Sequence, residues 1–228
     1  MIRKMEYGDS DYIVRLFTRE FGKVGAIAKN AKKSARRFGG RLEPFVHIRA
    51  SFKDNPRDLY FLQDVESIRS YGRFSEDFEL FMWGSFLLET IDVLLEDGLV
   101  NNELYELLEK TIGLLNDSLA PIPAVLLFQL TALSMSGIGP NLESCADCGR
   151  PIEAESLFNI SKGGAVCLEC AEVKKNSFLV SKEFLSNPAM IEIQLGKAIQ
   201  YIRLFTKFTE YHTGKKLKSS QFIEEFRL

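Results

Sequence analysis

The chain has 228 residues, of which 46% are hydrophobic and 26% charged, and its formal net charge is −2 at pH 7. This composition is typical of an ordinary globular protein with one large or two modest cores. No segment has the roughly 20 uninterrupted apolar residues of a membrane span, and the N-terminus lacks an apolar run of signal-peptide length. We therefore expect a cytoplasmic protein in a reducing compartment.

Charge is unevenly distributed along the chain. Residues 1–72 carry 15 Lys and Arg against 9 Asp and Glu, a net charge of +6. Residues 73–142 carry 2 against 11, a net charge of −9, and residues 143–228 carry 12 against 11. We therefore expect a polyanion to contact the first segment and to avoid the second.

Short stretches rich in β-branched and aromatic residues indicate five strands in the first segment. Turn residues separate them, namely Gly22, Phe-Gly-Gly at 38–40 and Asp-Asn-Pro at 54–56. Five strands within 72 residues suit a small closed or partly open barrel. The predicted strands are residues 2–5, 11–18, 23–29, 44–52 and 59–67.

From Phe74 onward the apolar residues recur at helical spacing, with Asn, Asp, Pro and Gly at the breaks. The last predicted helix is closed by Gly214. The predicted fold class is α+β, with residues 1–72 as one domain and residues 73–228 as a helical domain that contains a long irregular loop at 145–170. The predicted helices are residues 78–98, 101–117, 123–137 and 196–214.

A basic run lies between the third and fourth predicted strands, and it contains no acidic residue from 29 to 41. Such a run is usually only a solvated surface. Here it belongs to a small barrel of net charge +6, and such barrels commonly bind single-stranded nucleic acid with a basic groove and stacking aromatic residues. We therefore expect a flexible positive arm that contacts phosphates through Lys29, Lys32, Lys33, Arg36, Arg37 and Arg41.

Aromatic residues of the predicted barrel could stack on bases, although the sequence does not say which are exposed. No catalytic motif accompanies them: the chain has no GxxxxGKS phosphate loop, no GxSxG elbow, no HExxH and no strand followed by GxGxxG. The sequence therefore predicts a binding protein and not an enzyme. The stacking candidates are Tyr12, Phe17, Phe38, Phe45, Phe52 and Tyr60.

All four cysteines lie in two CxxC pairs that are separated by 18 residues. Disulfides are unlikely to persist in a reducing compartment, and the spacing is in the range of paired zinc knuckles. Gly149 gives the first knuckle its backbone freedom, and Lys-Gly-Gly at 162–164 forms a turn into the second. Four thiolates leave no open position at zinc, so one structural zinc is favoured over a catalytic one. The predicted ligands are Cys145, Cys148, Cys167 and Cys170.

Two other interpretations of the cysteines stay open, namely a thiol redox site and a metal site degraded in function. The chain has two histidines, His47 and His212, and neither lies near the knuckles in sequence. We expect both to be plain surface or partly buried residues.

Several motifs, in order from about residue 7 to residue 171, resemble one known family. They are YGDSDYIVRLFTREFGKVGAIAKNAKK, then GGRLEPF, then SGIGPNLESCADCGRP and GGAVCLECA. The chain resembles the RecO family of bacterial recombination mediators and DNA repair proteins. The resemblance implies an N-terminal OB domain and a helical domain with an embedded zinc site. It also implies binding of single- and double-stranded DNA, strand annealing, and work with RecR to load RecA onto DNA covered by single-stranded-DNA-binding protein.

The resemblance carries over to particular residues. It assigns the zinc ligands to the four cysteines and the DNA-facing loop to Lys29 through Arg41. The family tends to have Gly where this chain has Asn30, and Asn also tolerates a left-handed backbone. The chain starts only six residues before Tyr7, so either the first strand is short or the start lies upstream.

The resemblance also implies a receptor site for the acidic, apolar-ended tail of single-stranded-DNA-binding protein. The acidic segment 73–142 would repel that tail, so we expect it on the last long helix, near the Lys-Lys-Leu-Lys of 215–218. An alternative function is a zinc-stabilised RNA-binding or transcription-associated adaptor, and a third is a thiol oxidoreductase. The predicted partner-binding residues are Lys197, Arg203 and Lys207.

Overall fold

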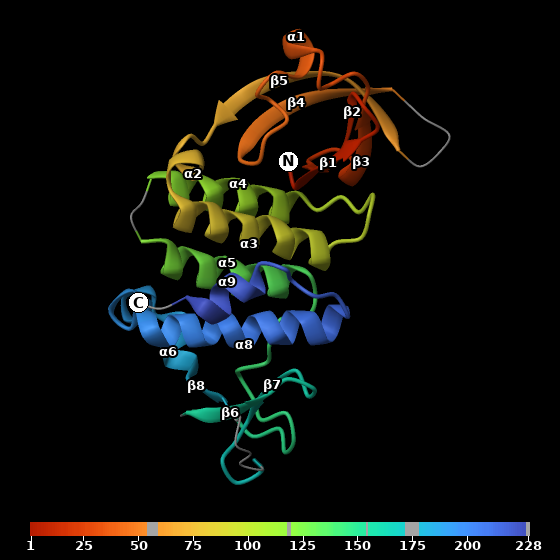
Figure 1. Cartoon of the computed structure of the whole chain (residues 1–228). Coiled ribbons are helices and arrows are strands. Elements are labelled where there is room, and N and C mark those ends of the chain that lie inside the picture. The colour runs from red at the N-terminus through yellow and green to blue at the C-terminus, as the bar shows by residue number, and fades with distance from the viewer. Residues whose placement is uncertain (54–58, 118–119, 154, 172–177, 227–228) are drawn as a thin grey trace. The chain divides into compact units, whose positions relative to one another are not determined.

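The computed structural model of the chain describes residues 1–53, 59–117, 120–153, 155–171 and 178–226 (Figure 1). By its contacts the chain divides into two compact units. Unit 1 consists of Met1–Gly84 and Leu95–Asp117, and unit 2 of Ser85–Leu94 and Ser118–Leu228. An N-terminal sheet is followed by helices, which confirms the α+β class. The domain boundary predicted between residues 72 and 73 stays a prediction.

Unit 1 contains a five-stranded sheet in the order β1-β2-β3-β5-β4. β3 and β5 pair in parallel and the other neighbours pair antiparallel. Small five-stranded Greek-key barrels have this strand order. The sheet is open between β1 and β4, since the described residues show no pairing of those two strands. The strands are β1 (Arg3–Tyr7), β2 (Asp11–Thr18), β3 (Gly22–Ala28), β4 (Val46–Lys53) and β5 (Tyr60–Ser70).

All five predicted strands are therefore present, with ends that differ by a few residues. The turn predicted at 54–56 lies outside the described residues. Alternate residues of β2 and nearly all residues of β3 are buried, and their small and branched side chains form much of the core of the sheet. The segment between β3 and β4 adds Phe38 and Leu42 to that core. The other fully buried core side chains are Val14, Leu16, Val24, Ala26, Ala28, Ala31, Leu62 and Val65.

The helices follow the predicted spacing, and the first of the long ones is shorter than expected. Helix α3 ends at Leu94 instead of residue 98, because residues 95–100 leave the helix and bond to the sheet. Helix α8 is closed by Gly214, whose φ is 67° and whose N–H donates to the carbonyl of Glu210, as predicted. The long helices are α3 (Phe78–Leu94), α4 (Asn102–Asp117), α5 (Pro121–Met135) and α8 (Leu195–Thr213), with a short α2 (Arg73–Glu76) before them.

Residues 95–100, which we call the covering segment, pack on β2 and β3 within unit 1. The N–H of Gly98 donates to the carbonyl of Lys23 at 2.8 Å. The Lys23 side chain is 1% exposed and its Nζ donates to the carbonyl of Leu95 at 2.6 Å. Asp97 forms an ion pair with Arg15 of β2. The covering segment therefore occupies the ends of these strands near the β2–β3 turn.

Unit 2 combines helices with a second, three-stranded sheet in the order β7-β6-β8. Figure 1 shows α5 alongside α8, and the rings of Phe205 and Phe208 on α8 contact Phe158 of β6 edge to face at 5.7 and 5.6 Å. The sequence analysis predicted an irregular loop here, and it missed strands that are only three or four residues long. The elements are β6 (Ser156–Asn159), β7 (Gly164–Val166), β8 (Phe178–Val180), α6 (Lys182–Ser186), α7 (Pro188–Ile193) and α9 (Ser220–Glu225).

No helix among the described residues combines the length and the apolar character that crossing a bilayer requires.

Candidate metal centre and nucleic-acid interface

The four cysteines converge in unit 2. Their Sγ atoms all lie within 4.8 Å of one another, and those of Cys148 and Cys167 are 3.9 Å apart. A tetrahedral zinc with Zn–S bonds of about 2.3 Å separates its sulfurs by about 3.8 Å, so the group has the dimensions of such a site. The four cysteines are therefore positioned to bind one metal ion.

The first knuckle is a tight turn that directs Cys145 and Cys148 to one point. Gly149 has a φ of 73° and its N–H donates to the carbonyl of Cys145 at 2.9 Å. The N–H groups of Asp147 and Cys167 lie 3.4 Å from the Sγ of Cys145. Backbone N–H groups, first that of Cys148 and then that of Cys167, lower the pKa of Cys145 to about 6. This sulfur is thus prepared as a thiolate.

The second knuckle follows β7 directly. The turn into it has Gly163 at a φ of 78°, and the N–H of Lys162 donates to Oδ1 of Asn159, which agrees with the turn predicted at 162–164. The N–H of Cys170 then folds back onto the carbonyl of Cys167 at 3.0 Å. Hydrogen bonding, first with Cys167, raises the pKa of Cys170 to about 12, so a metal ion must displace a proton from this ligand.

The basic loop of residues 29–41 is folded, so the expectation of a flexible arm is corrected. It contains helix α1 (Ala35–Phe38). The guanidinium of Arg37 donates to the carbonyl of Lys29 at 2.9 Å and to Oγ of Ser34 at 3.1 Å. Arg41 donates to the carbonyls of Arg36 and Arg37 at 2.8 and 3.1 Å. Two of the six predicted cations, Arg37 and Arg41, are therefore engaged with backbone carbonyls of their own loop.

The other four cations of the loop are exposed, and they differ in their partners. Lys29 pairs with Asp11 and Lys32 with Glu6, both at 2.8 Å. The side chains of Lys33 and Arg36 make no hydrogen bond or ion pair with any residue that the structure describes. Lys33 and Arg36 are consequently the cations of the loop that a phosphate can approach without displacing a carboxylate.

Of the six predicted stacking aromatics, two are buried and four are partly buried. Phe38 and Phe45 are 3% and 5% exposed. Phe17 lies against the ring of Tyr105, with centroids 5.6 Å apart. The remaining three are partly buried against the core of the sheet, namely Tyr12, Phe52 and Tyr60.

Phe21, which the sequence analysis did not single out, is 45% exposed at the β2–β3 turn. Its ring lies 6.2 Å from that of Phe52 and 6.1 Å from that of Tyr60. The signal for it in the sequence was an aromatic residue inside a turn, where no core requires one. Phe21 is the ring of this cluster that a base can reach.

OB domains usually bind oligonucleotides over strands 2 and 3 and the loops that follow strands 1 and 4. Here the covering segment and α4 occupy part of that face. Arg15 pairs with Asp97, Lys23 donates to Leu95, and Phe17 packs on Tyr105. The usual face is therefore partly covered, whereas Lys33 and Arg36 of the loop of residues 29–41 stay exposed.

The three predicted partner-binding residues lie on α8, and Arg203 has a structural task. Its guanidinium donates to the carbonyls of Ile223, Glu224 and Phe226 at 2.9, 3.1 and 2.8 Å. These carbonyls lie at the C-terminal end of α9, where the last C=O groups of a helix have no intrahelical partner. Arg203 is thus largely committed to holding α9.

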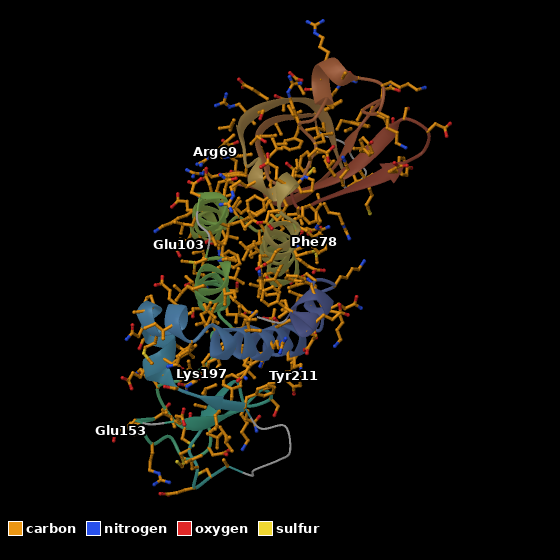
Figure 2. The ribbon with its side chains drawn as sticks, turned by 60° about the vertical axis from the view of Figure 1, so that its left-hand side comes forward. Arg69, Phe78, Glu103, Glu153, Lys197 and Tyr211 are labelled. Atoms are coloured by element: carbon orange, nitrogen blue, oxygen red, sulfur yellow. The ribbon has the colours of Figure 1, made fainter. Side chains whose placement is uncertain are left out.

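Lys197 lines a cavity of unit 2, and Lys207 lies against Phe178, another of its lining residues (Figure 2 labels Lys197). Lys197 is 5.0 Å from the centroid of Phe184, and Lys207 is 5.8 Å from that of Phe178. The cavity has a volume of about 460 Å³, and its lining combines aromatic rings with one ammonium group. It is lined by Glu155, Phe178, Leu179, Lys197, Gln200 and Tyr201.

The histidines behave as expected. His47 is half-buried, with Nε2 at 2.9 Å from the Tyr105 hydroxyl and Nδ1 at 3.2 Å from Glu109. His212 is exposed and its Nε2 lies 3.0 Å from the carbonyl of Ile160. Neither belongs to the group of four candidate metal ligands.

Two family models and many curated proteins match this chain. The model described as "Recombination protein O N terminal" matches residues 1–71, and the one described as "Recombination protein O C terminal" matches residues 75–221. A DNA repair protein RecO of Anaeromyxobacter dehalogenans (strain 2CP-C) is 33% identical over 99% of this chain and 94% of its own length. That of Myxococcus xanthus (strain DK1622) is 31% identical over 100% and 96%.

A more distant relative extends the same agreement. The DNA repair protein RecO of Exiguobacterium sp. (strain ATCC BAA-1283 / AT1b) is 27% identical over 99% of this chain and 93% of its own length. The similarity thus covers the sheet, the helices and the cysteine segment together. The chain therefore belongs to the RecO family of DNA repair and recombination mediator proteins.

Proposed function

We propose that this protein binds single- and double-stranded DNA through the loop of residues 29–41 and anneals complementary strands. With RecR it then helps to load RecA onto DNA covered by single-stranded-DNA-binding protein. The observation that carries the DNA contact is the pair of exposed cations, Lys33 and Arg36, on a loop folded by Arg37 and Arg41. Family membership supports the recombination role, which would place the protein in the cytoplasm at the nucleoid.

The mechanism needs no catalytic residue. Cations that contact phosphates hold a strand without reading its sequence, so a second strand can approach and pair through its own bases. Release of condensed counterions drives much of this binding. The covering segment occupies part of the face on which OB domains usually bind nucleic acid. We therefore propose that the DNA strand runs over the loop of residues 29–41.

We further propose that the four cysteines hold one structural zinc ion. The sulfurs of Cys145, Cys148, Cys167 and Cys170 fit a closed tetrahedral site, and four protein ligands leave no position for water or substrate. Zinc would supply cross-linking of the two knuckles. The neighbouring strands β6 and β7 belong to the small three-stranded sheet, which packs on α8 through Phe158 of β6.

The DNA proposal predicts a measurable change when the two exposed cations are neutralised. In Lys33→Gln with Arg36→Gln, each lost phosphate contact flattens the slope of log affinity against log salt by about 0.7 for single strands, or about 1.4 in total. Affinity should fall for all sequences alike. Fluorescence anisotropy of labelled oligonucleotides, titrated across a range of salt concentrations, measures both quantities.

A matched control removes the same charge elsewhere. Lys216→Gln with Lys218→Gln also removes two exposed cations, from the segment after α8, and should leave the slope unchanged. Equal slopes for wild type and the loop variant would show that the loop is only a solvated surface. Variants of Arg37 are less informative, because they also remove its hydrogen bonds to Ser34 and to the carbonyl of Lys29 within the loop.

The alternative function, an RNA-binding or transcription-associated adaptor, uses the same basic loop. A competition assay with RNA and DNA of equal length separates the two. The RecO function predicts annealing of complementary DNA strands, both free and covered by single-stranded-DNA-binding protein. Preference for RNA together with no annealing would favour the adaptor.

The cavity beside α8 is the site we propose for the acidic tail of single-stranded-DNA-binding protein. Its aromatic lining suits the apolar end of the tail. Lys197 pairs with Glu155 at 3.4 Å and Lys207 with Glu224 at 3.5 Å, and both would exchange these carboxylates for those of the tail. We expect Lys197→Gln with Lys207→Gln to weaken binding of a labelled tail peptide more than about tenfold, or about 1.4 kcal/mol. Lys33→Gln with Arg36→Gln, which removes two exposed cations from unit 1, serves as the control and should bind the tail peptide like wild type. Equal affinities at low salt would place the tail elsewhere.

A further inference from the structure

Arg150 lies directly after the first knuckle, and its guanidinium approaches sulfurs of both knuckles. Its Nε donates to the Sγ of Cys148 at 3.3 Å, and its Nη2 lies 3.8 Å from the Sγ of Cys167. These two sulfurs are themselves 3.9 Å apart. One side chain therefore contacts a candidate ligand from each CxxC pair.

Glu169 fixes the orientation of that guanidinium. This residue lies between the two cysteines of the second knuckle, and its Oε2 accepts from Nη2 of Arg150 at 2.5 Å. The ion pair joins the residue after the first knuckle to the middle of the second. A planar guanidinium can meet a sulfur with Nε and a carboxylate with Nη2 at the same time, and a lysine ammonium lacks this fixed fork.

The charge of a four-cysteine zinc site explains what such a contact does. Four thiolates around one Zn²⁺ leave a net charge of −2, which a nearby cation stabilises. Hydrogen bonds to ligand atoms also orient the ligands, and loss of such partners typically weakens metal affinity about 10- to 100-fold. The contacts of Arg150 with Cys148 and Cys167 have this form.

We propose that Arg150 is a positioning residue of the metal centre, which joins the two knuckles through their sulfurs and slows release of the metal. The proposal rests on the zinc site proposed above. It also implies that the same contacts shield the Cys148 and Cys167 sulfurs from electrophiles, because a sulfur bound to metal and to a hydrogen-bond donor is a weaker nucleophile.

The test compares zinc retention in wild type and Arg150→Gln. We expect zinc affinity, measured by competition with a chromophoric chelator, to fall about 10- to 100-fold, with faster release of the ion. Alkylation by iodoacetamide, in which a thiolate forms a C–S bond and iodide leaves, should accelerate in parallel. Arg150→Lys keeps the charge and should recover only part of the affinity. Glu169→Gln loses the orienting ion pair, so its affinity should fall by a smaller factor than that of Arg150→Gln.

Lys182→Gln is the matched control, because it removes one positive charge and one ion pair, with Glu143, from the same unit. It should retain zinc like wild type. If Arg150→Gln and Arg150→Lys both hold and release zinc as wild type does, the role of Arg150 is refuted while the zinc site stands. If wild type itself binds no zinc with its thiols reduced, the zinc site fails, and this proposal with it.

Discussion

We expect Cys145→Ser and Cys167→Ser each to lose the zinc ion proposed for this site and to unfold the segment around the knuckles, from which Phe158 packs on α8. Structural zinc contributes about 10–16 kcal/mol of apparent binding free energy in small peptides. Among the described residues, the group of candidate ligands at this site consists of the four cysteines. We therefore expect a lower melting temperature and poorer solubility. Metal analysis of the purified protein and thermal unfolding measure the two effects.

Leu168→Ser provides the control for these variants. Leu168 is 62% exposed and lies between the ligand cysteines of the second knuckle, so the variant adds a serine at the same place without removing a sulfur. It should keep one zinc per chain and a melting temperature near that of wild type. Metal analysis that finds no zinc in wild-type protein with fully reduced thiols would contradict the prediction.

The sheet and the four cysteines could be predicted from sequence because their signals are local. Alternation of residues such as Val14 and Leu16 marks a strand with one buried face. The CxxC spacing is itself a local pattern that predicts a tight turn with both sulfurs on one side. Gly149 and Asn30, residue types that tolerate a left-handed backbone, have φ of 73° and 54°. Each of these conclusions needs only neighbours in the chain.

The roles of individual cations could not be predicted in the same way. A sequence shows that Arg37, Arg41 and Arg203 are charged, and it does not show which backbone carbonyls lack a donor. Arg37 and Arg41 satisfy carbonyls of their own loop, and Arg203 satisfies those at the end of α9. Of the six cations predicted to contact DNA, two donate to carbonyls, two pair with carboxylates and two have neither partner among the described residues. Their contacts with DNA stay a prediction.

The covering segment was missed for a different reason. Residues 95–98 continue an apolar, acidic pattern that is compatible with helix α3, so local spacing extends the helix through them. The helix is ended by contacts with Lys23, which lies 72 residues before Leu95 in the sequence. The side chain of Lys23 donates to the carbonyl of Leu95, and its backbone carbonyl accepts from the N–H of Gly98. Such a contact has no signature in a local pattern.

This contact makes Gly22 a sensitive position. Gly22 has a φ of +63°, and a Cβ placed on it would lie 2.2 Å from the carbonyl oxygen of Leu99. An alanine there has to adopt a left-handed backbone, which costs about 1–2 kcal/mol. It must also push the covering segment away from β3, which stretches the hydrogen bond between Gly98 and Lys23, worth about 1 kcal/mol.

Gly22→Ala should accordingly reduce the free energy of unfolding by about 3 kcal/mol, a large effect for one methyl group. Gly8→Ala is the matched control: Gly8 has a φ of +57° and nothing within 4 Å of a placed Cβ, so it carries the backbone strain alone. Urea denaturation of both variants measures the difference. Equal losses would mean that the covering segment yields without cost and does not hold β3. A clearly larger loss for Gly22→Ala would support the packing of residues 95–100 as a fixed part of the sheet's surface.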